Sequence, residues 1–171
     1  MIGSATPVTE VLIARLIDQS DEVRIVETER DAAARWRALG AHVAVGSPVD
    51  ADLIERAAQY ARTIVVIDDG VNALEATVSA AIEGGLLASS GVRLVVCAGT
   101  IAASIAATIE RSGLSYVLLR TGAGAARRRR RISRTAIAAA IDAADDLAGE
   151  PRLDLELDTA VAWSELDVPH P

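Results

Sequence analysis

The stretch Ser112-Gly-Leu-Ser-Tyr-Val-Leu-Leu-Arg-Thr-Gly122 combines the end of a helix, a tight turn and a buried strand. Gly113 is expected to end the helix, because glycine adopts the left-handed conformation at little steric cost. Tyr116–Leu119 is an apolar run of strand formers that is too short for a helix of its own. Arg120 would then leave the strand at its carboxyl end, where open α/β sheets bind ligands. The stretch therefore predicts one helix–strand unit of an α/β fold.

The same alternation of helix and strand runs through the rest of the chain. Thr63–Ile67 is a continuous β-branched strand, typical of a parallel sheet covered on both faces, and Arg152–Leu157 alternates like an edge strand. The other predicted elements are strands at 22–27, 42–45 and 92–97 and helices at 7–19, 30–39, 50–60, 72–82, 101–111 and 133–147. Gly84-Gly85 is expected to loosen the helix that begins at Asn72.

We therefore expect a Rossmann-like, doubly wound, mainly parallel sheet with helices on both faces and right-handed crossovers. Residues 1–157 would form this single domain, with a first strand truncated to a stub at Met1-Ile2. Residues 158–171 would be an irregular tail.

Composition limits the classes of function. The 171 residues carry a net charge of −7, which argues against a general nucleic-acid binder. All 17 basic residues are arginine, so mechanisms that need a lysine are excluded. The single cysteine, Cys97, fits a cytoplasmic protein. The longest uncharged run, Leu94–Ile109, falls short of the ~20 residues that a membrane-spanning helix needs.

In the order of its predicted elements and in its local sequence motifs, the chain resembles the atypical short-chain dehydrogenase/reductases of the NmrA-like, NAD(P)-binding type. The resemblance covers almost the whole chain and is best at Ser112–Gly122, at Ile132-Ser133-Arg134 with its alanine-rich continuation, and at Leu39–Ser47. TrkA-type nucleotide-binding domains share the first half and are the nearest alternative, but they do not explain residues 112–157.

The resemblance implies a cofactor site. Its residues would be Gly3, Ser4, Ala5, Thr6, Glu27, Asp68 and Arg120. Glu27 matches the acid that holds the ribose of NAD and repels a 2′-phosphate, although it could equally be an exposed acid. Pro7 removes a backbone N–H and Glu10 brings a carboxylate near the phosphates. We therefore expect weak binding of NAD(H), with NADP(H) disfavoured.

The catalytic positions of the family are not filled. Cys97-Ala98 stands where the family has its serines, and neither tyrosine nor lysine occurs between Thr100 and Glu110. Without a lysine, no tyrosine pKa is lowered toward neutrality, so hydride transfer lacks its acid. The leading hypothesis is a non-catalytic nucleotide-sensing or interaction subunit. An NAD(P)-dependent oxidoreductase or isomerase with a reduced active site and a ligand-free assembly partner remain as alternatives.

Three further features allow two interpretations each. The run Arg127, Arg128, Arg129, Arg130, Arg131 could bind an anion or an acidic partner, or be a solvated loop. Asp68 could contact a ligand or close a solvated turn before Gly70. The nearly uncharged helices 72–82 and 101–111 predict a homodimer or heterodimer, unless the tail covers them.

The acids of the predicted helix 133–147 and the single cysteine are expected to have no role in chemistry. Asp142, Asp145 and Asp146 are expected to face solvent, and we expect no metal site there, because no histidine or cysteine accompanies them. Cys97 is expected to be a small buried hydrophobe and not a nucleophile.

Overall fold

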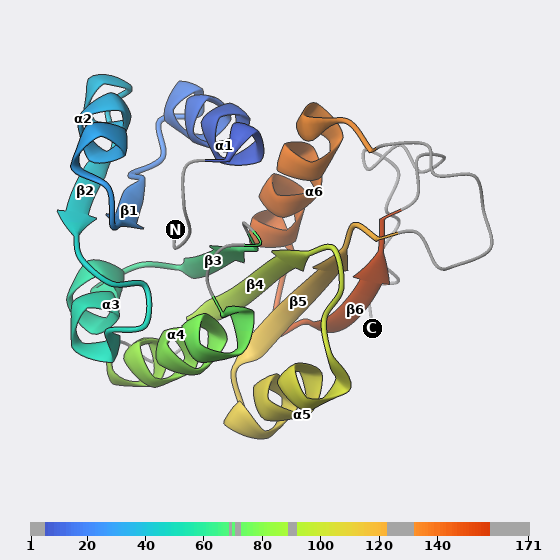
Figure 1. Cartoon of the computed structure of the whole chain (residues 1–171). Helices are drawn as coiled ribbons and strands as arrows, with labels where there is room; N and C mark the ends of the chain where they lie inside the picture. The colour runs from blue at the N-terminus through green and yellow to red at the C-terminus, as the bar shows by residue number, and fades with distance from the viewer. Residues whose placement is uncertain (1–5, 69, 71–72, 89–91, 123–131, 158–171) are drawn as a thin grey trace.

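A computed structural model describes residues 6–68, 70, 73–88, 92–122 and 132–157. Helices and strands alternate along this part of the chain (Figure 1). Their bounds are α1 Pro7–Asp18, β1 Arg24–Glu27, α2 Arg30–Ala38, β2 His42–Val45, α3 Ala51–Ala58, β3 Thr63–Ile67, α4 Leu74–Ala88, β4 Arg93–Ala98, α5 Ala103–Ser112, β5 Ser115–Arg120, α6 Arg134–Asp146 and β6 Arg152–Glu156. The predicted stub Met1-Ile2, the loop residues Gly3–Ala5, the run Arg127–Arg131 and the tail 158–171 lie outside the described residues.

All strand pairings in the described part of the chain are parallel, which confirms the predicted α/β class. The strands β3, β4, β5 and β6 form one hydrogen-bonded series in that order, and β1 pairs with β2. The outermost strand, β6, alternates between exposed and half-buried residues, as expected of an edge strand. No hydrogen-bonded pairing joins β1 to β3 among the described residues.

Helices cover both faces of the sheet, with α4 and α5 on one face and α1 and α6 on the other (Figure 1). Alternate residues of each central strand serve the two faces. In β4, Leu94 and Val96 pack toward α3, α4 and α5, whereas Val95 and Cys97 pack toward α1 and α6. This alternation explains why the central strands are apolar at every position.

Local signals in the sequence place the helix ends. Thr6, Asp50 and Ser133 each accept a hydrogen bond from the backbone N–H three residues later, at 3.2, 3.0 and 3.1 Å. These side chains satisfy N–H groups that a helix start leaves without partners. Gly113 ends α5 with φ at 79°, in the left-handed region where glycine is favoured.

The expectation that Gly84-Gly85 loosens its helix is wrong, because α4 continues through both glycines to Ala88. A Cβ at Gly84 would lie 2.9 Å from both the Ala51 carbonyl oxygen and the Glu55 nitrogen of α3. The absent side chain therefore lets α4 approach α3 closely. None of the helices in the described ranges is long and apolar enough to cross a membrane.

Candidate functional site

The carboxyl edge of the sheet, where the strands end at Glu27, Val45, Ile67, Ala98 and Arg120, is the candidate site. Because the strands are parallel, their carboxyl ends meet at this one edge. The helices α1 and α6 also begin there, so their amino termini carry partial positive charge toward the same edge. In α/β sheets this arrangement suits an anionic ligand such as a nucleotide phosphate.

Two glycines hold the middle of this edge together. A Cβ placed on Gly122 would lie 2.1 Å from the carbonyl oxygen of Gly99, whereas a Cβ on Gly99 would meet nothing within 4 Å. The Thr121 N–H donates to the Ala98 carbonyl at 2.9 Å, and the Asp68 N–H donates to the Cys97 carbonyl at 2.9 Å. The chain segments after β4 and β5 therefore touch, backbone against backbone, beyond the strand ends.

Glu27 ends β1 as predicted, but its side chain is only 2% exposed. One carboxylate oxygen accepts from the Trp36 indole N–H at 3.2 Å, and the other accepts from the Glu29 backbone N–H at 3.1 Å. A ribose would reach this carboxylate only if the residues that bury it moved. Direct contact between Glu27 and a ribose thus stays a prediction, while the burial of its charge is a structural feature that the sequence did not indicate.

The other predicted cofactor residues take local structural roles. Thr6 caps α1. The Asp68 carboxylate accepts from the Gly70 N–H at 2.9 Å, which is the local hydrogen bond expected if Asp68 closes a turn before Gly70. Glu10, which was expected to repel phosphates, is exposed on α1 and lies 4.0 Å from the Arg35 guanidinium. The nearby cation reduces the repulsion that Glu10 would exert on a phosphate.

Arg120 is engaged within the chain. Its Nε and Nη2 donate to the two carboxylate oxygens of Asp154 at 2.7 and 2.8 Å, and its Nη1 donates to the Ile101 carbonyl at 2.5 Å. Hydrogen bonding from Arg120 lowers the pKa of Asp154 below 3.8. Arg120 therefore joins β5, β6 and the segment before α5, and a cofactor role for it stays a prediction.

The groups that could donate a proton are poorly placed for chemistry at this edge. Burial, assisted by the charge of Asp68, raises the pKa of Cys97 to about 12, so its thiol is inert at neutral pH. Tyr116 is 7% exposed near the start of β5, and burial raises its pKa as well. Tyr60 is 92% exposed, but it follows α3 just before β3 begins and thus lies at the opposite edge of the sheet.

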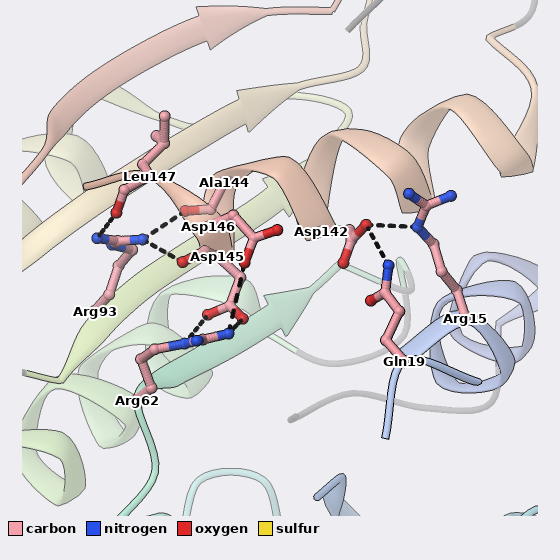
Figure 2. Close-up of polar contacts among 9 residues, drawn as sticks. All are labelled: Arg15, Gln19, Arg62, Arg93, Asp142, Ala144, Asp145, Asp146 and Leu147. Carbon is pink, nitrogen blue, oxygen red and sulfur yellow. Dashed lines mark hydrogen bonds and ion pairs between the residues drawn. The ribbon is translucent and has the colours of Figure 1, made fainter. Parts of the chain in front are cut away.

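The opposite, amino edge holds a polar cluster built around α6 (Figure 2). Asp142 is 6% exposed and accepts from the Arg15 Nε of α1 at 2.5 Å and from the Gln19 amide at 3.4 Å. Asp145 pairs with Arg62, which also lies 3.8 Å from Asp146. The expectation that these acids simply face solvent is wrong for Asp142 and Asp145, because arginines from other elements neutralise them.

Arg93 completes this cluster from the start of β4 and is 7% exposed. Its guanidinium donates to the carbonyl oxygens of Ala144, Asp145 and Leu147 at 2.6–2.8 Å (Figure 2). It also donates to the Gly149 carbonyl at 3.2 Å. A cation at the end of α6 is favoured by the helix dipole. Sequence reasoning missed this role, although an arginine at the start of an apolar, fully buried strand was a signal for it.

No group of three or more histidine, cysteine, aspartate or glutamate side chains could hold a metal ion within the described ranges. The acids at the amino edge are instead paired with arginines.

Comparison with known proteins supports the fold. No family model matches the sequence, and no curated protein sequence matches it. Among solved structures, the chain is similar to an anaerobillin reductase from Escherichia coli O157:H7, with 16% identity, a TM-score of 0.65, and coverage of 91% of this chain and 94% of that one.

Two further solved structures hold a bound cofactor. The Citrobacter sp. triphenylmethane reductase complexed with NADP(H) shares 12% identity, with a TM-score of 0.72 and coverage of 92% of this chain and 69% of that one. The NADPH-dependent quinone oxidoreductase from Escherichia coli complexed with NADPH shares 17%, with a TM-score of 0.69 and coverage of 92% and 69%. At these identities the likeness shows a Rossmann-like fold.

Proposed function

We propose that this chain binds an NAD(P)-type dinucleotide at the carboxyl edge of its sheet and performs no carbonyl reduction of its own, acting as a nucleotide-sensing or interaction subunit. The observation that carries the second half of the proposal is the position of the two tyrosines. Tyr60 lies at the amino edge and Tyr116 lies in the core.

Dinucleotide binding is supported by the edge itself. The helices α1 and α6 begin there, and the two residues that touch beyond β4 and β5, Gly99 and Gly122, carry no side chains. Backbone of this kind lets a pyrophosphate approach closely. Two neighbours of the same fold are described as complexes with NADP(H) or NADPH.

The absence of reduction follows from the chemistry of hydride transfer to a carbonyl. The oxygen that receives the hydride's electrons must gain a proton, and enzymes supply it from a positioned acid with a suitable pKa. The chain has no lysine to lower a tyrosine pKa, and Cys97 is buried with a pKa of about 12. A substrate bound at this edge could receive a hydride, but no tyrosine or thiol in the described part of the chain is placed to donate the proton that completes the reduction.

We further propose that NAD(H) is preferred over NADP(H). The Glu27 carboxylate is buried at the end of β1, and its hydrogen-bond donors are uncharged: the Trp36 indole N–H, the Glu29 backbone N–H and the Thr28 hydroxyl. A buried negative charge is weakly screened, so it disfavours a 2′-phosphate nearby even without touching the ribose.

A second candidate is an NAD(P)-dependent oxidoreductase with a reduced active site, because the structural neighbours named above are a triphenylmethane reductase, a quinone oxidoreductase and an anaerobillin reductase. A turnover assay decides between the two. The purified chain is incubated with NADH or NADPH and a panel of aldehydes, ketones and quinones, and cofactor absorbance is followed. We expect no consumption above the no-protein rate. Steady turnover that survives Tyr60→Phe and Tyr116→Phe would establish the oxidoreductase and contradict the proposal.

We propose that α4 and α5 form the interface through which this subunit associates with a partner. On α5, Ala103, Ser104 and Ala107 are exposed, and Leu86 and Leu87 are exposed near the end of α4. Small side chains permit close helix approach, and exposed leucines supply apolar area. Sedimentation equilibrium should show a dimer that Ala103→Arg dissociates while Ala34→Arg, on α2, does not. A monomeric unmodified chain at micromolar concentration would exclude self-association.

A further inference from the structure

The helices α1 and α6 are joined at one buried carboxylate, the Asp142 link. Asp142 of α6 is 6% exposed, and its Oδ2 atom accepts from the Arg15 Nε at 2.5 Å and from the Gln19 amide at 3.4 Å (Figure 2). Arg15 and Gln19 are one helical turn apart, so both project from the same side of α1. Two donors that meet at one carboxylate oxygen restrain both where the end of α1 lies and how it is turned on α6.

The apolar contacts beside this link define the angle between the two helices weakly. Leu12 of α1 belongs to the same buried cluster as four residues of α6, namely Ala138, Ala140, Ile141 and Ala144. Three of these four are alanine, whose short side chains form shallow ridges on a helix surface. Because interlocking ridges and grooves set the crossing angle of packed helices, the Asp142 link supplies direction that this surface lacks.

On its other side, α1 is held less firmly. Ile13 packs with Trp36 of α2 in a separate apolar cluster, and the exposed Glu10 lies 4.0 Å from the Arg35 guanidinium. Exposed ion pairs compete with water and contribute little. Hydrogen bonds to the buried Asp142 face less competition from water, so they restrain α1 more strongly than the Glu10–Arg35 pair does.

The capped amino termini of both helices stand at the same distance from the link. Thr6 precedes Arg15 by nine residues, and Ser133 precedes Asp142 by nine residues. Each amino terminus is therefore about 13 Å from the link along its helix. Because a helix of this length is stiff, a rotation of α1 by about 20° at the link would move its amino terminus by about 5 Å.

We propose that Asp142 is a positioning residue for the dinucleotide site. It sets the crossing angle of α1 and α6, and thereby the separation of the two amino termini that stand at the carboxyl edge. This role rests on the dinucleotide binding proposed above, because a bound pyrophosphate needs N–H donors at a fixed spacing. Arg62 and Arg93 join α6 to the sheet, whereas Asp142 joins the two helices to each other.

Distances between spin labels near the two amino termini test the link directly. The labels are attached to the full chain at Glu10→Cys on α1 and Arg134→Cys on α6, both exposed positions. The native Cys97 is buried with a pKa of about 12, so its thiol does not compete for the label. The unmodified link should give one narrow distribution of distances.

The variant that tests positioning apart from stability is Arg15→Met combined with Asp142→Leu. Apolar replacement of a buried ion pair is often neutral or stabilising, but it removes the directional bonds. We expect the distance distribution to broaden, or its mean to shift by about 3 Å or more. In the unlabelled chain, the same double substitution should weaken NADH binding at least about fivefold.

Asp145→Ala is the matched control, because Asp145 lies on the same helix but pairs with Arg62 and not with α1. It should leave the distance distribution unchanged and alter the affinity for NADH by less than about twofold. Arg15→Met alone changes an exposed position, and it should broaden the distribution even if the double variant fails to fold.

Two results would overturn the proposal. A folded variant with the distance distribution of the unmodified link would show that Asp142 does not set the helix angle. A changed distribution with unchanged affinity for NADH would show that the angle does not matter for binding. Failure of the unmodified chain to bind NADH would contradict the proposed function, whereas the label distances would still decide whether Asp142 positions α1.

Discussion

The two edges of this parallel sheet differ in what their polar groups do. At the amino edge, Arg93, Arg62 and Arg15 are committed to carbonyls and carboxylates of α6 (Figure 2). Around the middle of the carboxyl edge the contacts are mainly backbone to backbone, at Asp68 and Thr121.

The difference separates stability from ligand binding. The Arg93 side chain already donates to four carbonyl oxygens, whereas helix amino termini and exposed backbone at the carboxyl edge offer donors without losing a structural bond. Changes at Arg93 and Arg62 should therefore affect folding, and changes at the carboxyl edge should affect binding.

The largest effect is expected from Arg93→Ala. The substitution removes the donor for four carbonyl oxygens near the end of α6 and leaves a cavity at the start of β4. We expect the free energy of unfolding to fall by about 3 kcal/mol or more in urea titrations. Arg111→Ala is the matched control, because Arg111 is exposed and donates hydrogen bonds to Ala107 and Thr108 of its own helix, α5. It should change stability by less than about 0.5 kcal/mol. A loss below about 1 kcal/mol for Arg93→Ala would contradict the stabilising role of this edge.

An intermediate effect is expected from Gly122→Ala at the carboxyl edge. Its new Cβ would collide with the Gly99 carbonyl oxygen, 2.1 Å away, and the backbone on one side must move. Overpacking of this kind costs about 1–3 kcal/mol. Gly99→Ala, whose Cβ meets nothing within 4 Å, is the control and should be nearly neutral. Thermal unfolding of the two variants compares them directly, and equal transition temperatures would argue against the close contact.

The smallest effect is expected from Arg120→Gln. The pair with Asp154 is partly exposed, so its loss should cost no more than about 1 kcal/mol at neutral pH. The pKa of Asp154 is lowered in the folded protein, so the stabilisation is complete above 3.8 and is lost as pH falls through the lower folded value. The difference in unfolding free energy between the unmodified chain and the variant should therefore shrink below about pH 4. A difference that is constant down to pH 2 would rule out this carboxylate as the partner.

The sequence was sufficient for the fold because local signals agreed with one another. The β-branched run Thr63–Ile67 and the caps at Asp50 and Ser133 each need only neighbouring residues to act, and all three lie where they were predicted. Gly84 shows the limit of such signals, because its role depends on α3 passing within van der Waals distance.

Pairing across the fold could not be predicted from the sequence. Asp142 looks like one of several solvent-facing acids on α6, and only the approach of Arg15 from a helix 127 residues earlier buries it as a salt bridge. Glu27 likewise resembles an exposed acid in the sequence, although in the fold it is buried and accepts a hydrogen bond from Trp36 of α2. The sequence predicted that the candidate site lies at the carboxyl edge of the sheet. It did not predict which side chains at that edge face solvent.

The central claim, that a dinucleotide binds at the carboxyl edge, is tested most directly by titrating the isotope-labelled full chain with NADH and NADPH and following backbone amide shifts. We predict saturable shifts at Gly99, Thr121 and Gly122 and none at Arg62 or Arg93, with NADH binding more tightly than NADPH. The absence of shifts with both nucleotides at millimolar concentration would leave a ligand-free assembly partner as the function, and shifts confined to Arg62 and Arg93 would contradict the assignment of the two edges.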